Sequence, residues 1–128
     1  MGFTESDWKL FRSKIAIWQE NHIDKLNKIY IEILNSDSNP PEKFWELEKR
    51  INNDKKHPGV VIQVKRSTMI YNMAILLRDG VITKDDLEEF SDELKESIDG
   101  ILKLSITLTY LVTNQLHLQP LYRHNYRE

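Results

Sequence analysis

Cysteine is absent from this chain of 128 residues. Its absence excludes structural disulfides, thiolate metal sites and thiol nucleophiles, and it fits a reducing compartment, so we expect a cytoplasmic protein. Glycine and proline are scarce, with four of each. The scattered glycines form neither a phosphate-binding loop nor a dinucleotide fingerprint.

Long apolar runs are also missing. The most apolar stretch, residues 101–112, is interrupted by Lys103, Ser105, Thr107 and Thr109. It falls short of the roughly 20 apolar residues that a membrane-spanning helix needs. The first residues carry acids instead of a basic segment followed by an apolar one, so we expect no signal peptide. No membrane association is predicted.

Side chains that could perform chemistry are present, but their spacing does not indicate a site. None of the four histidines has the i,i+4 or Glu-x-x-His spacing of helical metal sites; they are His22, His57, His117 and His124. No serine lies in a Gly-x-Ser-x-Gly elbow. We therefore predict a protein that is not an enzyme, with no catalytic, metal-binding or cofactor-binding residues and no cofactor.

What the chain does contain is helical periodicity. Apolar residues at three- and four-residue steps predict a first helix over about 4–35, opened by the capping-box spacing of Thr4 and Asp7. A breaker cluster follows, in which Asn39 can cap a second helix over about 40–55. We expect this second helix to bury Phe44, Leu47 and Ile51.

Two more helices are predicted after residue 66. The third covers about 67–79 and ends at Gly80, which suits a left-handed C-cap. The fourth covers about 84–100 and begins with the capping spacing Thr83-x-x-Asp86. The predicted fold class is thus mainly α, a compact bundle of about four helices.

The C-terminal segment, about 102–112, leaves two possibilities open. Apolar and polar residues alternate almost perfectly over 102–110, which is typical of a strand. Such a strand could pair with 60–64 or with another copy of the chain, whereas the alternative is that the fourth helix continues. We expect one helical domain over 1–119, a frayed tail over 120–128, and either a monomer or a homodimer.

The aromatic residues lie at core spacing on their predicted helices. Trp8, Phe11 and Trp18 belong to the first helix, and Phe44 and Trp45 to the second. We interpret all five as packing residues. An aromatic residue that is exposed on the surface would instead indicate a binding hot spot.

Charge is distributed unevenly. Residues 79–99 contain nine acids and only two lysines. On the predicted fourth helix, the apolar stripe would leave the following acids exposed: Asp85, Asp86, Glu89, Asp92, Glu93 and Glu96. A row of this kind can imitate the phosphates of a nucleic-acid strand and enter a basic channel, or it can simply be a solvated surface. We call these six residues the acidic surface.

Several segments resemble one group of bacterial proteins. The similar segments include 42–50 (EKFWELEKR), 54–60 (DKKHPGV), 66–71 (RSTMIY) and 90–96 (FSDELKE). Over roughly residues 3–98, the chain resembles short proteins of gut Gram-positive genomes that often lie near mobile elements and have no established activity. The resemblance supplies no site residues, and the segment after residue 98 departs from the pattern.

These observations predict a protein that functions by binding. We expect a small adaptor or inhibitor whose acidic surface docks on a protein partner with a basic surface. The resemblance implies a modulator, carried by a mobile element, of a host or defence protein. The alternative is a regulator that binds nucleic acid through a basic patch formed by Lys55, Lys56, Lys65 and Arg66.

Overall fold

The computed structural model describes residues 2–118, which contain four α-helices. They are α1 (Glu5–Leu34), α2 (Pro40–Asp54), α3 (Met69–Arg78) and α4 (Asp92–Leu118). Two short 3-10 helices, η1 (Arg66–Thr68) and η2 (Lys84–Leu87), precede α3 and α4. The predicted mainly α fold with four helices is confirmed.

The alternatives left open by the sequence are decided in favour of helix. No strand occurs between residues 2 and 118, and residues 102–112 continue α4 instead of pairing with 60–64. The tail predicted over 120–128 lies outside the described residues. Within the described part of the chain, no helix has both the length and the apolar composition needed to cross a bilayer.

Local capping chemistry explains where several helices begin and end. The Thr4 hydroxyl accepts a hydrogen bond from the Asp7 amide while the Asp7 carboxylate accepts one from the Thr4 amide, a complete capping box. Asn39 accepts from the Glu42 amide at the start of α2. Gly80 follows α3 with a φ of 76°, the left-handed conformation that glycine adopts without strain.

The predicted fourth helix over 84–100 is wrong as a single element. Thr83 and Asp86 do form a capping box, but it opens only the four residues of η2. The chain then turns, and α4 begins at Asp92. Ser91 is responsible for the break, because its hydroxyl accepts from the Leu94 amide and its own amide and hydroxyl both donate to Asp7 of α1.

The hydrophobic core lies at the end of the molecule where α1, α3 and the start of α4 meet. Trp18 of α1 and Phe90 lie with ring centroids 6.2 Å apart. Each fully buried side chain of this size stabilises the fold by roughly 1.5–3 kcal/mol. The core comprises Trp8, Phe11, Ile15, Trp18, Met69, Met73, Ala74, Leu76, Ile82, Leu87, Phe90, Leu94 and Ile98.

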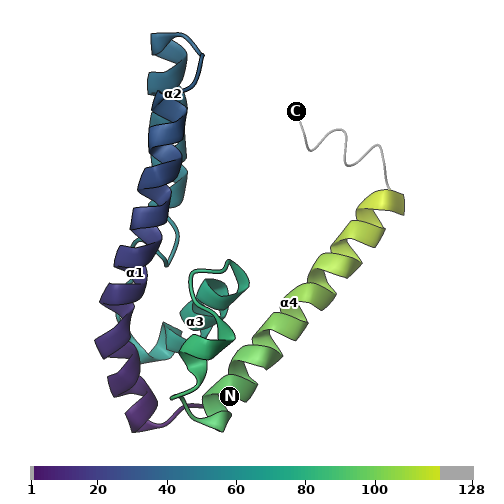
Figure 1. The fold of residues 1–128 in the computed structure, drawn as a ribbon. Helices are drawn as coiled ribbons and strands as arrows, with labels where there is room; N and C mark the ends of the chain where they lie inside the picture. Colours follow the sequence, from purple (N-terminus) through teal and green to yellow (C-terminus); the bar gives the residue numbers. More distant parts are fainter. Residues whose placement is uncertain (1, 119–128) are drawn as a thin grey trace.

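Beyond the core, the helices separate into two arms (Figure 1). The C-terminal half of α1 runs antiparallel to α2 in a hairpin, which we call the hairpin arm, and the later part of α4 leaves the core in a diverging direction.

Polar contacts join the two helices of the hairpin arm. The Tyr30 hydroxyl donates to Asp54 at 2.6 Å, and Arg50 forms an ion pair with the same carboxylate. Burial, the hydrogen bond to Asp54 and the negative charge of that carboxylate raise the pKa of Tyr30 to about 12. No residue of α2 is buried.

Candidate binding surfaces

The acidic surface is exposed at all six predicted positions. It is assembled from three segments and does not form the single helical row that the sequence suggested. Asp85 and Asp86 lie on η2, and Glu89 lies in the turn that follows. Asp92, Glu93 and Glu96 lie in the first turns of α4, where the helix dipole favours negative charge.

Two of the six acids have a structural role within the chain. Asp86 accepts from the Thr83 amide at 2.8 Å and from the Thr83 hydroxyl at 3.2 Å, so it caps η2. Glu89 forms an ion pair with Lys14 of α1 at 3.7 Å, and the Glu89 side chain is 70% exposed. Exposed pairs of this kind contribute little stability, so Glu89 can exchange Lys14 for a partner's cation at small cost.

The predicted basic patch is exposed, but one of its members is already engaged. Arg66 donates through both terminal nitrogens to Glu5, at 2.7 and 2.5 Å, and its guanidinium lies 5.3 Å from the centre of the Trp8 ring. These contacts fasten η1 to the start of α1. Lys55, Lys56 and Lys65 are exposed, so this surface offers nucleic acid fewer cations than the sequence suggested.

The prediction that all the aromatic residues pack in the core is wrong for α2. Trp8, Phe11 and Trp18 are buried, whereas Phe44 and Trp45 are each 61% exposed. The two exposed rings lie edge to face with centroids 4.9 Å apart. Ile51, also predicted to be buried, is 39% exposed, and Leu47 is half-buried. The reason is that α2 packs chiefly on α1 and extends past the core.

An apolar groove runs along the hairpin arm and was not foreseen from the sequence. One part, of about 280 Å³, is lined by Phe44, Leu47 and Ile51 of α2 together with polar neighbours. The next part, of about 300 Å³, shares Ile51 and adds Ile23, Leu26, Tyr30 and Val60. We call this feature the hairpin groove. The periodicity of Phe44, Leu47 and Ile51 was visible in the sequence, but the sequence did not show that no helix within residues 2–118 covers them.

A polar cluster joins the hairpin arm to the core. The Gly59 amide donates to His57 Nδ1 at 2.9 Å, so that nitrogen carries no proton, and Nε2 of the same ring donates to Asp79 at 2.7 Å. Arg78 and His57 both bond to Asp79, and these bonds hold the pKa of that carboxyl at about 2. Nε2 of His57 therefore attaches the segment after α2 to the end of α3, while Nδ1 holds the turn at Gly59.

His22 of α1 completes this cluster, with its ring centroid 5.6 Å from that of His57. Burial and the neighbouring His57 lower the pKa of His22 below 6.5, so the ring is neutral at physiological pH. Among the described residues, no His, Asp and Glu side chains are grouped to hold a metal ion. The contacts of this cluster join the segment after α2 to α1 and to the end of α3, and we call it the junction.

Gly59 is required in this junction because there is no room for a side chain. A Cβ atom at this position would lie 2.6 Å from Cδ2 of His22 and 3.0 Å from Nδ1 of His57. We expect Gly59→Ala to lower the free energy of unfolding by about 1–3 kcal/mol, the usual cost of overpacking. Urea denaturation would measure it. The clash predicts that Gly59→Ala costs less in a His22→Ala background, and equal costs in both backgrounds would contradict it.

Comparisons with profiles of known families, with characterised proteins and with solved structures find no match to this chain. The candidate surfaces must therefore be judged on their own geometry. They define a helical protein with three exposed features: the acidic surface, the partly engaged basic patch and the hairpin groove.

Proposed function

We propose that this chain is a non-enzymatic adaptor or inhibitor that docks on a protein partner through its acidic surface. The observation that carries this proposal is the exposure of all six predicted acids around the start of α4. Their charge is hardly balanced nearby, since residues 79–99 contain nine acids and two lysines. The partner's recognition surface is therefore basic, as on a protein that binds nucleic acid or another polyanion. The resemblance to proteins found near mobile elements fits a modulator of such a host or defence protein.

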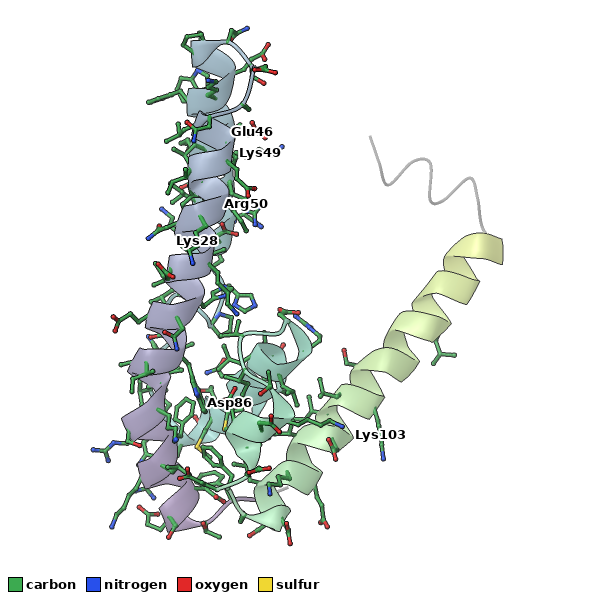
Figure 2. The ribbon with its side chains drawn as sticks, in the orientation of Figure 1. Lys28, Glu46, Lys49, Arg50, Asp86 and Lys103 are labelled. Carbon is green, nitrogen blue, oxygen red and sulfur yellow. The ribbon has the colours of Figure 1, made fainter. Side chains whose placement is uncertain are left out.

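The acidic surface also suits rapid association. Clustered charge of one sign steers an oppositely charged partner and raises the association rate, mainly at low ionic strength. The rival function, direct binding of nucleic acid by the basic patch, has less support because Arg66 is paired with Glu5. Figure 2 shows Asp86, a member of the acidic surface, at the core end of the molecule. The basic side chains Lys49 and Arg50 lie along the hairpin arm, away from Asp86.

The test is affinity capture from nuclease-treated lysate of the source cells with two charge-reversed variants. The first changes Asp85, Glu89 and Glu96 to Lys, and it keeps the capping Asp86 and the first two acids of α4. The second, a matched control, changes the exposed residues Glu20, Glu32 and Glu46 to Lys, so both variants have the same net charge.

We expect a partner that the wild type and the control retain and that the first variant loses. Equal capture by the two variants would refute the acidic surface as the docking site. Capture of nucleic acid from lysate without nuclease, lost on replacing Lys55 and Lys56 by Glu, would support the rival function instead.

A further inference from the structure

Two imidazole rings meet at the junction, and the contacts there depend on their protonation. The Gly59 amide donates to Nδ1 of His57 at 2.9 Å, which is possible only while that nitrogen carries no proton. Nε2 of the same ring bonds to Asp79, whose carboxylate also accepts from Arg78. The ring of His22 on α1 lies 5.6 Å from that of His57, and Gly59 is buried against both rings. The closed junction therefore suits two neutral imidazoles.

The surroundings of His22 oppose a positive charge on its ring. Burial has the largest effect, and His57 and Lys25 act in the same direction, so the pKa of His22 lies below 6.5. Asp54 at the end of α2 and Asp79 at the end of α3 favour the charge, but they act only from a distance. Once the junction opens, His22 regains its ordinary pKa of 6.5 and binds a proton more readily. Acid therefore favours the open junction.

Outside the junction, α2 and the turn that follows it are weakly attached. No residue of α2 is buried, and none of the buried residues of the hydrophobic core lies between residues 19 and 68. The hydrogen bonds to α1 include the one from Tyr30 to Asp54 and the one from Gln19 to the Pro58 carbonyl at 2.9 Å. A segment with few buried apolar contacts opens at a lower cost than the core does.

A separate anchor limits how far such an opening extends along the chain. Arg66 of η1 is fastened to the start of α1 by its two hydrogen bonds to Glu5 and by its position 5.3 Å from the centre of the Trp8 ring. Ile62 also packs against the core. These contacts involve no histidine, so they persist when the junction opens. The segment that can be released is therefore residues 40–61.

We propose that the junction is an acid-sensitive latch, in which uptake of a proton by His22 releases residues 40–61 from α1 and from the end of α3 while the core stays folded. Release uncovers the side of α1 that lines the hairpin groove, including Leu26, which is 7% exposed when the latch is closed. The acidic surface lies on η2, on α4 and in the turn between them, outside the released segment. The latch therefore does not depend on the proposed docking function.

Amide hydrogen exchange of the full chain, followed by NMR at about pH 7.5 and about pH 5.5, tests the latch. After correction for the intrinsic exchange rate, we expect the protection factors of the α2 amides to fall about 3- to 10-fold in acid. The upper limit arises because a released His22 with a pKa of 6.5 is protonated about ten times as often as it is neutral at pH 5.5. The amides of α3 belong to the core and should change less than about 2-fold.

Two variants assign the response to one side chain. His22→Gln cannot take up the proton, so its α2 amides should have the same protection at both pH values within about 2-fold. The matched control, His117→Gln, replaces a histidine of α4 and should keep the full response of the wild type. The readout is the ratio between the two pH values within each variant, so a variant that is less stable at both values still gives a result.

Several results would overturn the proposal. Unchanged protection of α2 in the wild type would do so, as would a response of His22→Gln as large as that of the wild type. An equal loss of protection in α2 and α3 would show that acid unfolds the whole chain instead of opening a latch. An NMR titration of the His22 ring gives a second readout, and a pKa at or above 6.5 would contradict the latch.

Discussion

Replacement of Asp7 by Ala will lower the free energy of unfolding by about 3–5 kcal/mol. Asp7 is 2% exposed, and its carboxylate accepts from the Ser91 amide at 2.8 Å, from the Ser91 hydroxyl at 2.5 Å and from the Thr4 amide at 2.9 Å. Hydrogen bonds to a charged group contribute about 1.5–3 kcal/mol each, and the donors left in a buried site add a penalty. One side chain thus fixes both the start of α1 and the break before α4.

Urea denaturation of Asp7→Ala beside Asp85→Ala measures this effect. Asp85 is exposed, so its replacement should change the unfolding free energy by less than about 0.5 kcal/mol. Ser91→Ala should also be destabilising, and the two effects should not add, because the residues share their hydrogen bonds. A loss below about 1 kcal/mol for Asp7→Ala would contradict the anchoring role.

The same carboxylate makes stability depend on pH. Burial raises the pKa of Asp7, but the hydrogen bonds from Ser91 and Thr4 outweigh it and hold the pKa below 3.8. A carboxyl whose pKa is lower in the folded state binds fewer protons there, so its stabilisation is present above pH 3.8 and is lost as pH falls through the folded-state pKa. The wild type should therefore lose more stability in acid than Asp7→Ala does.

Phe11→Ala will cost about 3–5 kcal/mol, whereas Trp45→Ala will cost less than about 0.5 kcal/mol. Phe11 is 0% exposed and lies between Trp8 and Trp18, so its removal leaves a cavity. Trp45 is 61% exposed on α2, which contributes no buried residue. Thermal and chemical denaturation of both variants would measure the contrast. A large loss for Trp45→Ala would show that α2 packs more closely than described.

Helix positions were predictable wherever the signal was local. The capping residues Thr4 and Asn39 and the terminating Gly80 act on their own neighbours, so their spacing in the sequence is sufficient. The break at Ser91 was not predictable, because it depends on Asp7, which lies 84 residues away along the chain. Without that contact, the periodicity of 84–100 describes one helix.

Burial of the aromatic residues was predictable for α1 but not for α2. Trp8, Phe11 and Trp18 face helices that cover them, whereas Phe44 and Trp45 have the same kind of spacing and no covering element among the described residues. Periodicity identifies an apolar face but not what packs against it. The alternation over 102–110 left strand and helix both open, and the structure shows that this segment continues the helix that contains Ile98.

The most direct test of the proposed docking is the dissociation constant of the captured partner for the two charge-reversed variants. Each reversal on the acidic surface should change binding by roughly 0.5–1 kcal/mol, so the three at Asp85, Glu89 and Glu96 should weaken it at least about 10-fold. The control at Glu20, Glu32 and Glu46 should bind like the wild type. Equal weakening by both variants would show that net charge alone governs binding and would contradict a docking site at the acidic surface.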